Sequence, residues 1–180
     1  MKLAYIMSPT RGETDPLLAR IANQLAGVGV RICETVRKNT PRPDSPARDM
    51  DLVVLLDGPV LRISQHRGPG AHGCRFDAGS LEMAVEAVGR RLDLGADLMN
   101  INKFGKQEAE GRGFRTLIAR AIDLGVPVLV GLNSLNKEAF DRFADGIATA
   151  VPADCNVIPD WANLFANCDD QPHKQFELHS

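Results

Sequence analysis

The sequence has no apolar run that approaches the roughly 18–20 consecutive residues needed to cross a bilayer. Its N-terminus carries one lysine and about five apolar residues, which is shorter than a secretion signal. These two absences predict a soluble, cytoplasmic protein without membrane insertion.

Cysteine pairs of the C-x-x-C type are also missing. The four cysteines are widely spaced along the chain, at Cys33, Cys74, Cys155 and Cys168. This spacing argues against a zinc knuckle or a disulfide framework, and we expect reduced, mostly buried thiols. The formal net charge of −2 predicts no general affinity for nucleic acid.

Positive charge is nevertheless concentrated in four loop-like segments, residues 8–14, 37–50, 65–75 and 102–112. Together they contain ten Lys or Arg and five acidic residues, in a chain whose overall charge is −2. If these loops gather at one edge of the fold, that edge attracts anions.

Patterns typical of strands and helices alternate along the chain. Buried strands are predicted at 2–7, 30–36, 51–56, 60–64, 96–101, 126–132 and near 147–151, and helices from 15 to about 27, 77–92, 114–124, 136–145 and 159–167. The segment 37–50 is rich in proline and predicts a loop, whereas Asp57-Gly58-Pro59 predicts a hairpin. We therefore expect one α/β domain over residues 1–167, with a three-layer, mostly parallel sheet, one β-hairpin, and a polar, frayed tail over 168–180.

The stretch "MSPTRGETDPLL" (7–18) follows the first predicted strand and is laid out like a phosphate-binding loop. A P-loop reads G-x-x-x-x-G-K-[ST], and its backbone N–H groups and lysine surround the phosphates. Gly12 and Thr14 match this pattern, but Met7 replaces the first glycine and Glu13 replaces the lysine. A carboxylate there repels a triphosphate, which Arg11 would partly offset. A plain turn between strand and helix explains the same residues equally well.

A P-loop enzyme also needs a buried strand that ends in an acidic residue, which holds magnesium. The candidate strand "ADLMNIN" (96–102) ends instead in Asn102, followed by Lys103. Asparagine is a weaker magnesium ligand than aspartate, and lysine cannot replace the second acid.

Four further segments carry a family resemblance: "NTPRPD" (39–44), "RDMDL" (48–52), "ISQHRGPGAHGCRFD" (63–77) and "NKFGKQEAEGRGFR" (102–115). Over residues 1–150 the chain resembles a bacterial family of unknown function, domain-of-unknown-function family 2478. That family is grouped with P-loop nucleotidases of the thermophile nucleoside-triphosphatase type. Its members are often labelled as molybdenum-transport ATP-binding proteins, so the resemblance implies a P-loop-like fold and a link to molybdate.

The chain departs from the active nucleotidases of that type at the decisive positions. Glu13 stands at the lysine position, and Asn102 and Lys103 stand where two acids are usual, whereas Glu108 matches an acid further along the loop. Because the two charge changes have opposite signs, we expect Glu13 and Lys103 to form an ion pair between neighbouring strands. Two separate solvated charges are the alternative.

Lys106 and Arg112 lie with Lys103 in a glycine-rich loop that is suited to an oxyanion; surface ion pairs are the alternative. The residues predicted to hold a ligand are Arg11, Gly12, Glu13, Thr14, Asn102, Lys103, Lys106 and Arg112, and Glu108 is the candidate catalytic residue. His66, His72 and Cys74 do not make a convincing ligand set, and no metal site is predicted.

The sequence thus predicts a P-loop-like protein that binds a small anion and acts as an accessory or sensor in molybdate metabolism. The ligand would be a nucleotide with magnesium, or molybdate, tungstate or phosphate; the macromolecular partner would be a second copy or a transport system. Two alternatives stay open. One is an active nucleoside triphosphatase with a rearranged site, and the other is a scaffold without a small ligand.

Overall fold

The structure is a computed structural model, and it describes residues 3–8, 12–42, 45–54, 60–64 and 77–153. Its helices and strands are, in chain order, β1 (Leu3–Ile6), α1 (Thr14–Gly27), β2 (Ile32–Arg42), β3 (Ser45–Val54), β4 (Val60–Arg62), α2 (Ala78–Asp93), β5 (Leu98–Ile101), α3 (Lys106–Ala109), α4 (Arg115–Asp123), β6 (Val128–Gly131), the 3-10 helix η1 (Ser134–Asn136), α5 (Lys137–Ala144) and β7 (Ala148–Val151). The predicted helix 159–167 and the predicted tail 168–180 lie outside the described residues.

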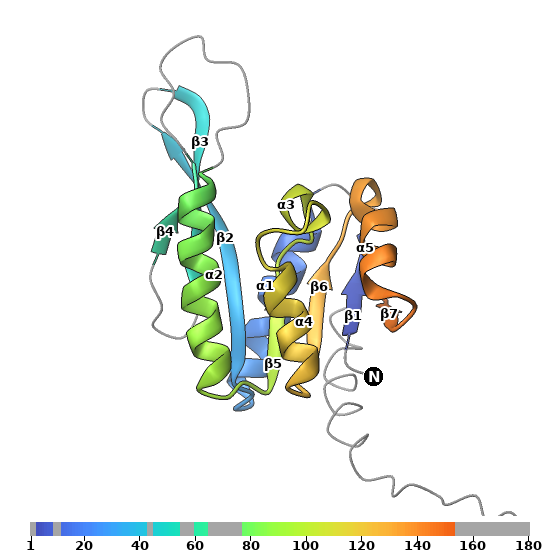
Figure 1. The fold of residues 1–180 in the computed structure, drawn as a ribbon. Helices are drawn as coiled ribbons and strands as arrows, with labels where there is room; N and C mark the ends of the chain where they lie inside the picture. The colour runs from blue at the N-terminus through green and yellow to red at the C-terminus, as the bar shows by residue number, and fades with distance from the viewer. Residues whose placement is uncertain (1–2, 9–11, 43–44, 55–59, 65–76, 154–180) are drawn as a thin grey trace, which may run out of the picture.

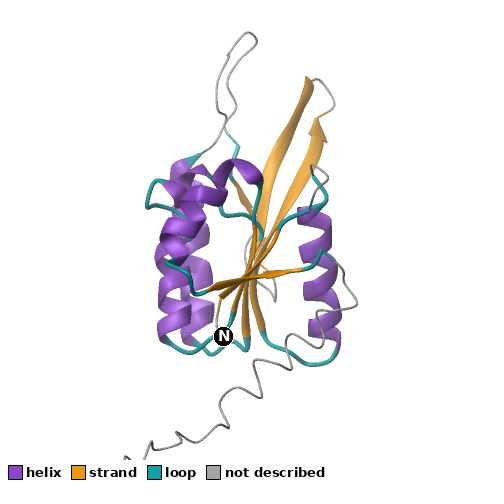
Figure 2. Ribbon diagram, turned by 90° about the vertical axis from the view of Figure 1, so that its right-hand side faces the viewer, coloured by secondary structure: helices purple, strands orange, loops and turns teal. Residues whose placement is uncertain are grey.

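One sheet of seven strands forms the centre of the fold, in the order β4-β3-β2-β5-β6-β1-β7. Its five strands from β2 to β7 in this order are parallel, and β3 and β4 are antiparallel to their neighbours. The helix α1 covers one face, and α2, α4 and α5 cover the other (Figure 1 and Figure 2). The predicted three-layer, mostly parallel α/β fold is therefore confirmed.

Each face of the sheet has its own apolar core. Leu18, Ile21 and Leu25 on α1 pack against Ile6 and Leu129. On the other face, side chains of the remaining helices bury a larger cluster that includes Phe104, Ile118 and Phe140. Strands covered on both sides are almost wholly apolar, which explains why β5 and β6 are buried at every position.

The segment 37–50 corrects the prediction of a proline-rich loop. Most of it continues β2 and begins β3, and the two strands pair from Thr35–Val54 to Arg42–Ser45. This ribbon stands out beyond the body of the molecule (Figure 1). Proline is tolerated at sheet edges and irregularities, and the register of this pair shifts between Pro41 and Arg42. The predicted hairpin is also present, because β3 pairs antiparallel with β4.

The first helix begins at Thr14, one residue before the predicted start at residue 15. Glu13 is the N-cap residue, and its carbonyl accepts the first helical hydrogen bond from the Leu17 N–H at 3.1 Å. The second helix agrees with the predicted helix over 77–92, and the Asp77 side chain caps it by accepting a hydrogen bond from the Ser80 N–H at 3.2 Å.

Candidate functional site at the carboxyl edge of the sheet

The loop between β1 and α1 reaches the edge where the parallel strands end. Gly12 has a φ of +90°, a backbone conformation that glycine adopts without strain. Glu13 is exposed, and its Oε2 accepts a hydrogen bond from Ser8 Oγ at 3.2 Å. Thr14 is the first residue of α1. The predicted ligand residue Arg11 lies outside the described residues.

Glu13 occupies an electrostatically favourable position at the N-terminus of α1. The aligned peptide dipoles give a helix N-terminus a partial positive charge, which stabilises a nearby anion. In a P-loop this position faces the bound phosphates. A ligand anion at this loop must therefore displace or accommodate the Glu13 carboxylate.

The second loop follows β5 and holds the two residues that replace the expected acids. Asn102 is 8% exposed, and its backbone lies directly against Gly131 at the end of β6. The Phe104 N–H donates to the Gly131 carbonyl at 2.8 Å, which fixes this loop to its neighbouring strand. Lys103 is exposed. An amide and a cation thus follow the buried strand β5.

The predicted ion pair between Glu13 and Lys103 is wrong for the structure described here. Neither residue has an ion pair among the described residues, and Glu13 is bonded to Ser8 instead. The prediction assumed that the first strand and the strand 96–101 are neighbours. In the sheet, β6 lies between β1 and β5.

Glu108, the candidate catalytic residue, is only 5% exposed and is bonded at both carboxylate oxygens. Oε2 accepts from the Gly105 N–H at 2.8 Å, and Oε1 accepts from the Phe114 N–H at 3.1 Å. The carboxylate therefore joins the two ends of the 105–114 loop. This arrangement favours a structural role; the catalytic role stays a prediction.

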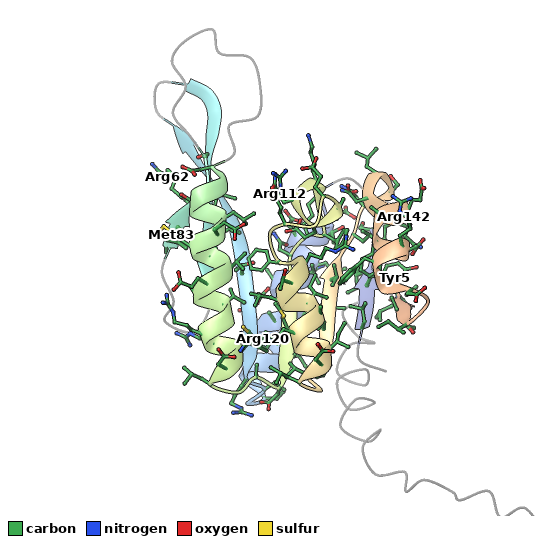
Figure 3. All side chains as sticks on the ribbon, viewed as in Figure 1. Tyr5, Arg62, Met83, Arg112, Arg120 and Arg142 are labelled. Atoms are coloured by element: carbon green, nitrogen blue, oxygen red, sulfur yellow. The ribbon has the colours of Figure 1, made fainter. Side chains whose placement is uncertain are left out.

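Lys106 and Arg112 both pair with Glu110. The Lys106–Glu110 separation is 3.6 Å, and Arg112 forms a close ion pair with the same carboxylate. Their side chains are exposed, so each pair contributes little to stability. Arg112 lies at the end of the molecule where the parallel strands terminate, whereas Arg120 lies at the opposite end (Figure 3). Two cations share one acid, which leaves this loop with surplus positive charge.

A hollow of about 430 Å³ lies beside the first loop. Its described lining residues are Ser8, Glu13, Pro16, Leu17, Arg20 and Ala153. It therefore connects the first loop with the flank of α1 and with the residues that follow β7. The residues of the predicted basic segment 65–75 and the candidate metal ligands His66, His72 and Cys74 lie outside the described residues.

Sequence reasoning missed a buried polar pair under α1, formed by Glu34 on β2 and Asn100 on β5. Asn100 Nδ2 donates to Glu34 Oε1 at 2.8 Å. The available signal was a polar residue inside each of the apolar strands "VRICETV" and "ADLMNI". A charged residue is almost never fully buried unless it is paired.

Two solved structures share the fold of this chain. A human cancer-related nucleoside triphosphatase has a solution structure with a TM-score of 0.56 and 16% identity, covering 96% of this chain and all of that one. THEP1 from the hyperthermophile Aquifex aeolicus gives the same TM-score and identity, covering 92% of this chain and 99% of that one. The chain has the fold of a P-loop nucleoside triphosphatase.

The family follows from the sequence match. The model of the family described as "Protein of unknown function (DUF2478)" matches residues 3–161, and the chain belongs to this family. This confirms the family resemblance. A curated relative is the Molybdenum import ATP-binding protein ModC 2 of Bradyrhizobium diazoefficiens, 36% identical over 160 residues. The match covers 89% of this chain and 18% of that protein, so the chain spans less than a fifth of this relative.

Among the described residues, no helix is both long and apolar enough to cross a membrane.

Proposed function

We propose that this domain binds a small anion, a nucleotide or an oxyanion, at the loop between β1 and α1, and hydrolyses triphosphates slowly or not at all. One observation carries the proposal. A strand, a glycine-containing loop and a helix N-terminus follow one another as in a P-loop, whereas the sequence pattern has Glu13, Asn102 and Lys103 where a P-loop enzyme has a lysine and two acids.

Anion binding is supported by backbone N–H donors at the N-terminus of α1 and by nearby cations. The first N–H groups of α1 have no intrahelical partner, and no side chain caps them at Glu13. The space beside Gly12 is open, since a methyl group added there would meet no atom within 4 Å. Lys103, Lys106 and Arg112 supply positive charge from the second loop.

The loss of hydrolysis follows from the charges. A P-loop lysine neutralises the β- and γ-phosphate oxygens, and a carboxylate in its place destabilises them; like charges 4 Å apart cost about 1–4 kcal/mol. An uncharged Asn102 weakens magnesium binding, so the developing charge on a transferred phosphoryl group is less compensated.

A rearranged active nucleoside triphosphatase is the second candidate, with Lys103 or Lys106 in place of the loop lysine and Glu108 positioning water or magnesium. The geometry of Glu108 weighs against it. Both carboxylate oxygens are already bonded to backbone N–H groups, and the side chain is buried.

The link to molybdate comes from the relative's name. That protein is named for molybdenum import, and we propose that this chain serves molybdate metabolism as an accessory or sensor. The cytoplasm is its proposed location, and a second copy or a transport system is its proposed macromolecular partner.

A thermal-shift screen tests the proposal. The panel is ATP, GTP and ADP with magnesium, and phosphate, molybdate and tungstate, each compared with chloride at equal ionic strength. A ligand at 100 times its dissociation constant adds about 2.7 kcal/mol, which raises the melting temperature of a chain of this size by about 5–10 °C.

The outcomes separate the candidates. A clear shift without nucleotide turnover supports the proposal. Steady magnesium-dependent hydrolysis, abolished in Glu108→Gln while that variant stays folded, supports the active enzyme. If no anion in the panel shifts the melting temperature, the anion-binding proposal is wrong, and a scaffold role takes its place.

A further inference from the structure

A carboxyl–amide pair lies buried between α1 and the sheet. Glu34 and Asn100 are register partners on the adjacent parallel strands β2 and β5, and they are 1% and 0% exposed. Asn100 Nδ2 donates to Glu34 Oε1 at 2.8 Å and to the Leu18 carbonyl of α1 at 3.3 Å. The pair therefore connects two strands and the helix that follows the first loop.

One oxygen of the Glu34 carboxyl group and the single oxygen of the Asn100 amide have no hydrogen-bond partner among the described residues. Glu34 Oε2 and Asn100 Oδ1 are fully buried, and neither has a hydrogen-bond partner among the described residues. Both atoms are acceptors when Glu34 is ionised, so they cannot satisfy each other. An unsatisfied buried acceptor costs about 1–3 kcal/mol, and a buried unpaired charge costs more.

One hydrogen atom removes this conflict. A carboxylic acid and a primary amide can form two hydrogen bonds, in which the amide N–H donates to the acid carbonyl and the acid O–H donates to the amide carbonyl. The first of these two hydrogen bonds, from the Asn100 amide to Glu34 Oε1, is present in the structure. We propose that Glu34 keeps its proton in the folded protein and donates it to Asn100 Oδ1, which closes an acid–amide pair that anchors α1 to the sheet.

The electrostatic surroundings support the proposal. Burial raises the pKa of Glu34 to about 8, and the hydrogen bond from Asn100 offsets only part of this effect. The charged groups described on the elements packed around it are Asp15 and Arg20 on α1 and Asp51 on β3. None of these three groups is among the causes of the shift in the pKa of Glu34, so no cation among the described side chains replaces the proton.

The pair makes the anchoring of α1 dependent on pH. The pKa of Glu34 is about 8 in the folded protein, above its ordinary value of 4.5. The stability from the protonated pair is therefore complete below pH 4.5, is lost as the pH rises through about 8, and changes little above that. Leu18 lies one helical turn after Thr14, so loosening α1 also disturbs the loop before it. This last step rests on the proposed function.

The first test measures the proton directly. In wild-type protein at about pH 7, exposed carboxyl groups are ionised, and the infrared carbonyl band of a protonated carboxylic acid reports Glu34. We expect this band at neutral pH, its loss as the pH rises through about 8, and its absence in Glu34→Gln. A wild-type protein without the band at neutral pH overturns the proposal, whether or not the variant folds.

The second test measures stability. The amide of Glu34→Gln supplies a permanent N–H donor to Asn100 Oδ1, so its urea midpoint should exceed that of wild type at about pH 9, with the advantage shrinking towards about pH 5. Glu86→Gln, which removes only an exposed ion pair with Arg90 on α2, should keep the pH dependence of wild type. An equal pH dependence in wild type and Glu34→Gln contradicts the proposal.

The third test links the pair to the ligand. Anion affinity measured by calorimetry should fall in wild type above about pH 8 and remain constant in Glu34→Gln. If wild type binds no anion at any pH, the proposed function fails, and the infrared and stability results still decide the proton site. If anions bind but the stability profiles coincide, the proton site fails and the proposed function survives.

Discussion

Gly113 lies against the Glu108 carboxylate so closely that a methyl group there would overlap Oε1 of Glu108. Gly113 also has a φ of +60°, which disfavours side chains. The two residues therefore depend on each other: the buried carboxylate can reach the backbone N–H groups of Gly105 and Phe114 only because Gly113 has no side chain.

Gly113→Ala tests this contact. The substitution adds a steric overlap to the backbone strain, and overpacking of this kind costs about 1–3 kcal/mol. Gly111→Ala is the matched control, because Gly111 also has a positive φ, +84°, but its added methyl group meets no atom within 4 Å. Urea unfolding should show a clearly larger loss for Gly113→Ala. Equal losses contradict the contact.

Glu108→Gln tests whether the carboxylate joins the ends of its loop. The amide can accept at one oxygen, but its NH₂ group then faces a backbone N–H, and one donor loses its partner. We expect a loss of about 1–3 kcal/mol in the free energy of unfolding.

The control for Glu108→Gln is Glu110→Gln, two residues away. Glu110 is exposed and forms only surface ion pairs, so its replacement should change stability by less than about 1 kcal/mol. Similar small effects from both variants, measured by urea unfolding, would show that Glu108 has no structural role.

The order of helices and strands was predictable because each element has its own hydrophobic period. Residues at the ends of helices also mark their start or stop, such as Asp77 before α2 and Gly125 after α4. The order of strands in the sheet was not, because it depends on contacts between distant parts of the chain. Placing β6 between β1 and β5 is what removed the expected Glu13–Lys103 pair.

The other errors of prediction also arise from contacts between parts of the chain that the sequence does not show. Prolines in the segment 37–50 indicated a loop, but a ribbon at the margin of a sheet tolerates them. The partner of Glu34 was also hidden, because Asn100 is 66 positions away and its alignment is set by strand register. The family pattern singled out Glu108 as a candidate catalytic residue. Its hydrogen bonds with the N–H groups of Gly105 and Phe114 depend on the folded loop and could not be predicted from the sequence.

Cys33 should react slowly in the native protein. It is 3% exposed, its Sγ donates to the Val88 carbonyl at 3.3 Å, and burial raises its pKa to about 11. The thiol therefore stays protonated at about pH 8, and the thiolate is the form that reacts. Iodoacetamide labelling followed by peptide mass spectrometry should find Cys33 unmodified in native protein and modified in urea. Rapid native labelling would contradict its burial.

The position of the ligand can be tested through Glu13. If an anion binds at the N-terminus of α1, Glu13→Gln removes a repulsion worth about 1–4 kcal/mol, so affinity should rise by about fivefold or more. Glu13 makes no side-chain cap to α1, so the helix should remain intact. Glu86→Gln serves as the control, since Glu86 lies on α2 across the sheet.

Calorimetric titration of wild type, Glu13→Gln and Glu86→Gln with the anion that gives the largest thermal shift is therefore the most direct measurement. We predict that the dissociation constant falls about fivefold or more in Glu13→Gln and is unchanged in Glu86→Gln. Equal affinities in all three proteins would contradict binding at the loop between β1 and α1.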